Sequence, residues 1–253
     1  MLTALFFCAP VRAQEAMPVA TVAAESIPPA AGGPVVMELF SSQACIFCPR
    51  ADRLFADLVT QPDIIGLACH VDYFDVKQGA LSQPFCTARQ TWYERLLRAG
   101  PSYTPQVVMQ GALDVVGYKI DDVGAGMKKA AQLPVLPLYI FATDKENEFR
   151  VALPDTAGKL GGDASLYLMA YDRPHEVTIA EGPNRGQNVT YVNIVSDIRD
   201  LGAWPDGQQG TVITAPLSDA QEGFALLLQN SVSGKILAAG KYKREPVAVA
   251  PSP

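Results

Sequence analysis

The chain has 253 residues, with 20 basic and 26 acidic side chains, a formal net charge of −6 and a pI of about 5.0. This length suits one large or two ordinary domains, and 49% hydrophobic against 18% charged residues excludes disorder as the main state. The acidic balance argues against nucleic acid or an anionic membrane surface as a partner. With only two histidines, a multi-histidine metal centre is not expected, and we expect no other cofactor.

The N-terminus carries the pattern of an export signal. Residues 2–9 form an apolar run that is too short to cross a bilayer as a helix. Small side chains at Val11 and Ala13 match the positions that a signal peptidase recognises, so we predict a signal peptide over residues 1–13. After cleavage we expect no membrane attachment. Disulfides persist outside the cytoplasm, and four cysteines remain in the mature chain: Cys45, Cys48, Cys69 and Cys86.

The first half of the mature chain alternates strand-like and helix-like patterns. Residues 14–33 are rich in Ala, Pro and Gly and predict a flexible leader. Over residues 34–133 we expect a sheet with helices on both faces. The expected strands are 35–40, 64–74, 106–109 and 113–117, and the expected helices are 45–59, 85–99 and 120–131.

Helical patterns nearly vanish over residues 134–243. Short strand-like runs separated by turn residues predict an all-β, sandwich-like C-terminal domain. The runs are 138–143, 149–154, 164–171, 176–181, 189–195, 211–216, 224–230 and 236–242. Residues 244–253 predict a flexible tail.

Two cysteines two residues apart stand where a strand gives way to a helix, in the run Cys45-Ile46-Phe47-Cys48-Pro49. Free N–H groups and the helix dipole at such a position stabilise a thiolate on Cys45. The spacing lets Cys48 reach Cys45 and resolve a mixed disulfide. We therefore prefer a redox dithiol to a structural disulfide. We expect the Cys45 sulfur to be partly exposed and Cys48 to be more buried.

A second motif, Tyr103-Thr104-Pro105, precedes the expected strand 106–109. With the cysteine motif it resembles the thioredoxin superfamily, including DsbA-like oxidants, in which a Thr-Pro dipeptide with a cis bond faces the redox cysteines. The resemblance implies an α/β thioredoxin-like domain, followed here by the all-β (sandwich-like) domain. It also implies that Thr104 and Pro105 pack against the dithiol and present backbone to the substrate.

Glu38 lies in the strand before the cysteines, where the superfamily often has a buried acid near the active site. The resemblance makes Glu38 the matching proton relay to Cys48, although it stands one residue further from the first cysteine than that pattern. Glu38 alternates with Met37 and Leu39, so it faces the other side of the strand, and a plain solvent-facing acid is the alternative.

Longer stretches resemble a bacterial secreted thioredoxin-like family classed as a domain of unknown function (DUF1223-like). They are ELFSSQACIFCPRAD, HVDYFD, TARQ, YTPQVVMQG and NRGQNVTYVNIV, and the resemblance covers roughly residues 35–242. The sequence departs from the family at Phe74 and at residues 77–79, where Trp and a Gly-Trp pair are usual. The resemblance implies the fold and a periplasmic or secreted location in a bacterium, and it implies no reaction.

Cys69 and Cys86 are predicted to form a second, stabilising disulfide that closes a loop of about 18 residues. Their Cα atoms are then expected about 4.4–6.8 Å apart. The alternative is that this pair relays electrons with Cys45 and Cys48.

Three functions remain open from the sequence. The first is a monomeric thiol–disulfide oxidoreductase acting on protein thiols or disulfides, or on small thiols. The second is a non-catalytic thioredoxin-like module whose disulfides are structural and whose β region binds a partner. The third is copper handling by Cys45, Cys48 and one histidine, although the sequence places neither His70 nor His175 near the dithiol. Asp52 is expected only to complement the first helical turn.

Overall fold

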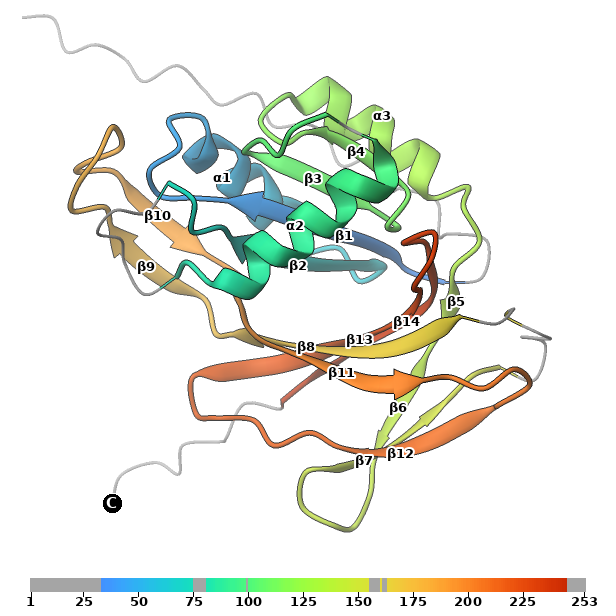
Figure 1. Ribbon diagram of the computed structural model, residues 1–253. Helices are drawn as coiled ribbons and strands as arrows, with labels where there is room; N and C mark the ends of the chain where they lie inside the picture. Colours follow the sequence, from blue (N-terminus) through green and yellow to red (C-terminus); the bar gives the residue numbers. More distant parts are fainter. Residues whose placement is uncertain (1–32, 75–80, 99, 155–159, 161–162, 245–253) are drawn as a thin grey trace, which may run out of the picture.

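The computed structural model describes residues 33–74, 81–98, 100–154, 160 and 163–244 (Figure 1). The predicted signal peptide, the leader up to residue 32 and the tail from residue 245 lie outside the described residues, as does the segment 77–79. No helix in the part of the chain that the structure describes is long and apolar enough to cross a bilayer.

The first sheet has four strands in the order β2-β1-β3-β4. They are β1 (Val35–Ser41), β2 (Ile64–His70), β3 (Gln106–Met109) and β4 (Leu113–Val116). Every residue of β1 and β2 is buried, as expected for near-continuous apolar runs that are covered on both faces. β1 pairs parallel with β2 and antiparallel with β3, so the chain leaves β1 at the sheet end where β3 begins.

Three helices pack on this sheet, and all three were predicted. They are α1 (Cys48–Leu58), α2 (Pro84–Leu97) and α3 (Ile120–Ala130). α1 begins at Cys48 and not at Cys45, because the residues before it form turns closed by a 3.1 Å bond from Cys45 N–H to the Ser42 carbonyl. Proline opens both α1 and α2, at a position where no helical N–H is required.

After α3, the helices and strands of the described chain are all strands. A five-stranded sheet runs β11-β8-β13-β14-β5, a three-stranded sheet runs β12-β7-β6, and β9 and β10 form a hairpin. The bounds are β5 (Leu136–Pro137), β6 (Tyr139–Ala142), β7 (Glu148–Ala152), β8 (Ala164–Asp172), β9 (His175–Thr178), β10 (Asn188–Tyr191), β11 (Val195–Ala203), β12 (Gly210–Thr214), β13 (Gln221–Asn230) and β14 (Ile236–Lys243). The expected run 189–195 divides into β10 and the start of β11 at Asn193, whose φ is +50°.

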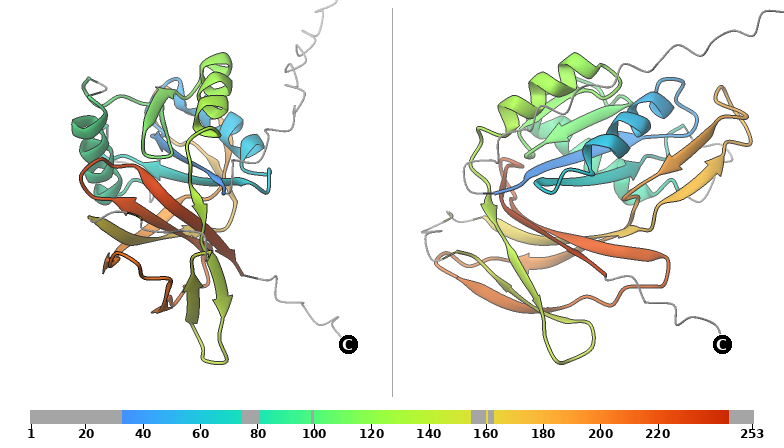
Figure 2. Two further views of the ribbon diagram at one scale, coloured as in Figure 1. Left: turned by 90° about the vertical axis from the view of Figure 1, so that its right-hand side faces the viewer. Right: turned by 180° about the vertical axis from the view of Figure 1, so that it is seen from behind.

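The elements stack in layers (Figure 2). One face of the first sheet packs against α1 and α3, with Met37 and Leu39 of β1 in that core. The opposite face packs against α2 and the five-stranded sheet, so Phe40 of β1 shares a core with Leu227 of β13. A third core lies between the five-stranded and three-stranded sheets.

The expected fold class, an α/β thioredoxin-like domain followed by an all-β sandwich-like domain, is wrong. The described residues hold fourteen strands in several sheets against three helices, so the chain is mostly β. The C-terminal strands also do not stand apart. β8, β13 and β14 share a core with β1, β2 and α2, and the β9–β10 hairpin returns to pack beside α1. Hydrophobic alternation marks each strand in the sequence, but it does not tell which sheet will cover which face.

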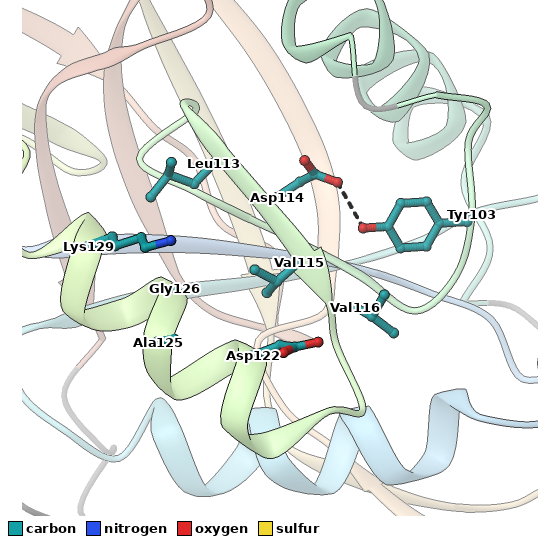
Figure 3. Close-up of a pocket in the computed structure, with 9 residues that line it drawn as sticks. All are labelled: Tyr103, Leu113, Asp114, Val115, Val116, Asp122, Ala125, Gly126 and Lys129. Atoms are coloured by element: carbon teal, nitrogen blue, oxygen red, sulfur yellow. Dashed lines mark hydrogen bonds between the residues drawn. The ribbon is translucent and has the colours of Figure 1, made fainter.

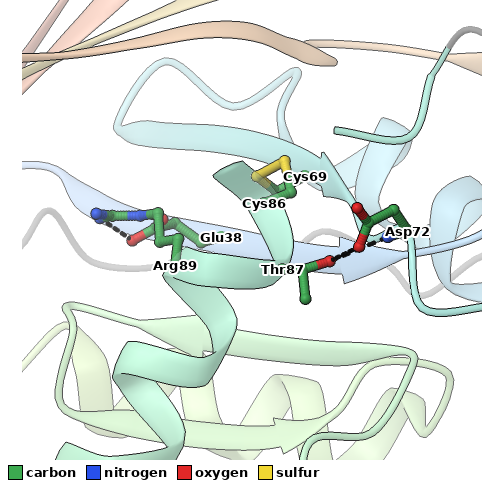
Figure 4. Close-up of a disulfide and its surroundings, with 6 residues drawn as sticks. All are labelled: Glu38, Cys69, Asp72, Cys86, Thr87 and Arg89. Atoms are coloured by element: carbon green, nitrogen blue, oxygen red, sulfur yellow. Dashed lines mark hydrogen bonds and ion pairs between the residues drawn. A yellow bond between two sulfur atoms is a disulfide. The ribbon is translucent and has the colours of Figure 1, made fainter. Parts of the chain in front are cut away.

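The predicted disulfide between Cys69 and Cys86 is confirmed and ties β2 to α2 (Figure 4). The Cα atoms are 5.3 Å apart, and both residues are fully buried. Beside it, the Thr87 hydroxyl donates to the Asp72 carboxylate, and the Asp72 N–H donates back to the same hydroxyl. The bridge thus holds the start of α2 against the sheet.

Replacing both Cys69 and Cys86 with Ala is expected to lower the free energy of unfolding by about 3 kcal/mol. The pair is 17 residues apart, and opening a loop of that size releases chain entropy of this order in the unfolded state. Urea unfolding of the oxidised wild type and the double variant measures the difference. A loss below about 1 kcal/mol contradicts the prediction, and reduced wild-type protein is the matched control.

Candidate functional site

Cys45 and Cys48 are free thiols at the start of α1. Cys45 lies in the turn before the helix, and its carbonyl accepts the N–H of Cys48 at 3.1 Å. Cys45 is 6% exposed and Cys48 is completely buried. Cys48 is the more buried of the two, as expected, but Cys45 is also buried, so the expected partial exposure of its sulfur is wrong. The reactive sulfur of any exchange reaction at this site is Cys45, because Cys48 offers no access.

The surroundings of Cys45 favour its thiolate. The hydrogen bond from the Cys48 thiol lowers the pKa of Cys45 most, and the Thr104 side chain and the N–H groups of Phe47 and Cys48 lower it further. Burial opposes them, and the net result is a pKa of about 6. Donors that converge on a charged sulfur at a helix start are the usual cause of an acidic cysteine.

Cys48 has the opposite surroundings. Burial raises the pKa of its thiol far above the ordinary value, and the hydrogen bond to Cys45 and the charge of Asp52 raise it further. The pair is therefore asymmetric, with an acidic outer thiol and an inner thiol that holds its proton. This asymmetry is the requirement for one cysteine to attack and the other to resolve.

Asp52 is the acid beside the dithiol. It stands four residues after Cys48 on α1, on the same helix face, and it is only 4% exposed. Burial raises the pKa of its carboxyl to about 7. Neither carboxyl oxygen has a hydrogen-bond partner within the described ranges, although Ser41 lies close enough to oppose the rise slightly. The expectation that Asp52 only complements the first helical turn is wrong: α1 begins at Cys48, so Asp52 lies beyond its first turn and is buried, and its place beside the dithiol was missed.

Glu38 does not lie beside the dithiol. It belongs to the face of β1 opposite Met37 and Leu39, which share a core with α1. Its carboxylate accepts two bonds from the Arg89 guanidinium and one, at 2.5 Å, from the Tyr93 hydroxyl (Figure 4). Glu38 is 1% exposed, so it is not the solvent-facing acid either. Glu38 of β1 and Arg89 of α2 form a buried ion pair. This placement gives no support to a proton relay from Glu38 to Cys48.

Thr104 and Pro105 come from the segment before β3, and their peptide bond is cis, as predicted. The Thr104 side chain lies close enough to the Cys45 sulfur to favour its thiolate by hydrogen bonding, which lowers the pKa of Cys45. The motif is held from behind by Gln90 of α2, which donates to the Tyr103 carbonyl at 2.8 Å. The structure therefore brings Thr104 together with Cys45.

Several buried polar groups near the dithiol lack partners. The hydroxyls of Ser41 and Tyr191 and both ring nitrogens of His70 make no hydrogen bond within the ranges that the structure covers. His70 meets Tyr191 edge-on, with ring centroids 5.0 Å apart, and burial lowers the pKa of His70 to about 3. Unpaired buried polar groups are rare in native proteins and often mark functional sites. Ser41 and Tyr191 lie near Cys48 and Asp52, and His70 contacts Tyr191.

Exposed apolar side chains stand next to Cys45 in the sequence. Ile46 is 62% exposed, and Phe47, at 51%, stacks on the ring of Tyr118 with centroids 4.7 Å apart. Tyr73, which follows β2, is also partly exposed. Burial raises the pKa of its hydroxyl to about 12, and the charges of Cys48 and Cys45 contribute less. Apolar contact area is therefore available next to the sulfur.

A pocket lies elsewhere, between β4 and α3. It has a volume of about 360 Å³ on the outer side of β4 and α3 (Figure 3). It is lined by Tyr103, Leu113, Asp114, Val115, Val116, Asp122, Ala125, Gly126 and Lys129. Asp114 accepts bonds from Tyr103, at 2.8 Å, and Gln106, at 3.2 Å, so its carboxylate is already engaged. Of its lining residues, Tyr103 belongs to the Tyr103-Thr104-Pro105 motif.

Metal binding gains no support from the side chains. Within the described residues, no group of three or more His, Cys, Asp or Glu side chains is arranged to hold a metal ion. His175 opens β9, where its Nδ1 lies 3.1 Å from the Arg173 carbonyl.

No curated protein matches the chain. An X-ray structure of a protein from Agrobacterium tumefaciens is similar, with a TM-score of 0.64 and 28% identity over 83% of this chain and 93% of that one. HBP35 of Porphyromonas gingivalis has a related fold, with a TM-score of 0.53 and 13% identity over 87% of this chain and 81% of that one.

The family described as "Protein of unknown function (DUF1223)" matches residues 36–229, which include the dithiol, the disulfide and most of the β region. The family resemblance noted in the sequence is thus confirmed over most of the described chain. The chain belongs to the DUF1223 family of proteins of unknown function.

Proposed function

We propose that this protein is a thiol–disulfide oxidoreductase that acts outside the cytoplasm, in the periplasm or after secretion. The observation that carries the proposal is the asymmetry of the dithiol. Cys45, 6% exposed and next to the exposed Ile46 and Phe47, lies among donors that stabilise its thiolate, and Cys48 is completely buried with its proton retained. A structural pair has no need of this difference. The apolar N-terminal segment supports the location.

The exchange uses the two sulfurs in turn. The Cys45 thiolate attacks one sulfur of a substrate disulfide, forms a mixed disulfide and expels the other substrate sulfur as a thiolate. Cys48 then gives its proton to the Asp52 carboxylate and attacks Cys45. This step forms the Cys45–Cys48 disulfide and expels the second substrate sulfur. Two electrons pass from the dithiol to the substrate, and the reverse sequence oxidises a substrate dithiol.

Thr104 supplies a donor to the Cys45 sulfur, and Pro105 beside it presents backbone to the incoming chain. The exposed side chains of Ile46 and Phe47 favour a protein thiol or disulfide with apolar neighbours over a small polar thiol. The substrate is a partner molecule, and we propose that the protein itself acts as a monomer.

Trapping tests the proposal. In Cys48→Ser the mixed disulfide on Cys45 cannot be resolved, so the variant is expected to accumulate covalent adducts with periplasmic proteins. Cys45→Ser removes the attacking sulfur and is expected to trap none. Non-reducing gels of the purified variants, with the double variant as the control, measure the adducts.

The non-catalytic binding module predicts a different pattern. If the dithiol is only a cross-link, the two single variants lose stability equally and neither collects adducts, because each removes the same bond. That result sinks the oxidoreductase.

A further inference from the structure

The β9–β10 hairpin reaches back from the β region to the dithiol. Val189 and Tyr191 of β10 pack into the same core as Ala51 and Phe55 of α1. Figure 1 shows the hairpin beside α1, at the far side of the first sheet from β4. The turn that joins β9 to β10 therefore lies at the N-terminal end of α1, where Cys45 is found.

One side chain of this turn directly contacts the dithiol loop, the turn from Gln43 to Cys48. The side-chain amide of Asn184 donates to the backbone carbonyl of Gln43 at 2.8 Å and to that of Cys45 at 2.7 Å. Asn184 is 1% exposed, and 139 residues separate it from Cys45 in sequence. Both amide hydrogens are thus spent on the dithiol loop. These are bonds to the reactive turn itself and not to the helix behind it.

The turn around Asn184 is itself well fixed. The side-chain oxygen of Asn184 accepts from Gln187 at 3.2 Å, and its carbonyl accepts the Gln187 N–H at 3.1 Å. Gly186, whose φ is +83°, donates to the Ile179 carbonyl at 2.8 Å. A left-handed backbone of this kind suits glycine, so the loop is shaped to hold Asn184 in place.

We propose that Asn184 is a positioning residue for the dithiol: it locks the turn from Gln43 to Cys48 so that the N–H groups of Phe47 and Cys48 face the Cys45 sulfur. The inference rests on the proposed function and assigns part of the β region a task within it. The carbonyl oxygen of Cys45 accepts hydrogen bonds from the Asn184 side-chain amide and from the Cys48 N–H. This oxygen therefore links the hairpin to the start of α1.

The consequence is chemical as well as structural. When the two bonds from Asn184 are lost, the turn can rotate, and the N–H donors no longer converge on the sulfur. The Cys45 thiolate then loses stabilisation, whereas a merely structural anchor would leave the thiol unchanged and lower only the stability of the fold.

The test compares Asn184→Ala with Asn188→Ala. Asn188 lies on the same hairpin and is exposed, and its side-chain oxygen accepts a hydrogen bond from the Thr178 hydroxyl, away from the dithiol, so it is the matched control. The reduced full-length proteins are alkylated with iodoacetamide across pH. We expect Asn184→Ala to move the midpoint of Cys45 alkylation up by about one pH unit, or roughly tenfold less thiolate at low pH. Asn188→Ala should leave it unchanged.

A second variant covers the case in which Asn184→Ala does not fold. Asn184→Ser keeps one donor in the same turn, and its midpoint should fall between those of the wild type and an unconstrained cysteine. The inference is overturned if the folded variants lose thermal stability while the midpoint stays at the wild-type value. If the wild type itself titrates like an ordinary cysteine, the proposed function fails first, and the two failures are thereby told apart.

Discussion

Cys45 in the reduced protein is expected to react with iodoacetamide at a rate that is half-maximal near pH 6, where its pKa of about 6 places half of it as thiolate. An ordinary cysteine with a pKa of about 8.5 is roughly 0.3% thiolate at that pH. The thiolate population of Cys45 is therefore more than a hundredfold larger. A thiolate of lower pKa is also a weaker nucleophile, by about tenfold over this range, so the net advantage at pH 6 is about tenfold.

The midpoint is the sharper readout, because it does not depend on nucleophilicity. Below pH 6 the rate should fall about tenfold per pH unit. Cys48→Ala removes the donor that lowers the Cys45 pKa most, and Thr104→Ala removes the next side-chain donor, so both should raise the midpoint, the first more than the second. Mass spectrometry should find alkylation on Cys45 alone. A wild-type midpoint above about pH 8 would exclude an activated thiol.

The elements of the first sheet could be predicted because their sequence periods are clear. The strands VVMELFS and IIGLACH are mostly apolar, and α1 and α3 each carry one apolar face. The elements that pack on each face of the sheet could not be predicted in the same way. Leu227 of β13 lies in the core with Phe40, and nothing in either strand's alternation names the other as its neighbour. The wrong fold class follows from this gap.

In the candidate site, too, local motifs could be predicted from the sequence, whereas contacts between distant residues could not. The cysteine spacing and the Thr-Pro motif are local patterns, and the structure brings Thr104 to Cys45 as expected. The face of Glu38 followed from alternation, but its partner Arg89 stands 51 residues away and no pattern announces it. Asn184 is a further case, since a buried asparagine in a turn resembles any turn residue in the sequence.

Asp52 falls between these cases. Its distance of four residues from Cys48 puts both on one helix face, which the sequence alone shows. Its burial depends on β10, whose Tyr191 lies close enough for the charge of Asp52 to help raise the pKa of the tyrosine, after burial itself. The chemistry of the residue was therefore set by a strand that the sequence placed in another domain.

Replacing Asp52 with Asn is expected to stabilise the protein at neutral and higher pH. The pKa of Asp52 rises from 3.8 to about 7 on folding, through burial. Between these two values the unfolded chain is ionised at this site while the folded protein still binds the proton. Stability from the neutral carboxyl is therefore complete below about pH 4 and is lost as pH rises through 7, by up to about 4 kcal/mol. An uncharged Asn escapes this loss.

Urea unfolding at about pH 4 and about pH 8 measures the effect. Wild type should weaken between the two values, Asp52→Asn should change much less, and the difference should vanish at the lower pH. Asp57→Asn makes the same chemical change on the exposed side of α1 and should alter stability by less than about 0.5 kcal/mol. If the free energy of unfolding changes with pH equally in Asp52→Asn and in the wild type, the Asp52 carboxyl is solvated and the prediction is wrong.

A buried carboxyl that weakens the fold at working pH needs a reason to be there, and proton transfer from Cys48 supplies one. Asp52→Asn should therefore resolve mixed disulfides more slowly, by about a hundredfold if the carboxylate acts as the base, while Cys45 still attacks at nearly the wild-type rate. Rapid mixing of a preformed Cys45 adduct, followed by quenching, separates the two steps. A variant that is more stable at high pH yet resolves at the wild-type rate would leave Asp52 without a part in the exchange.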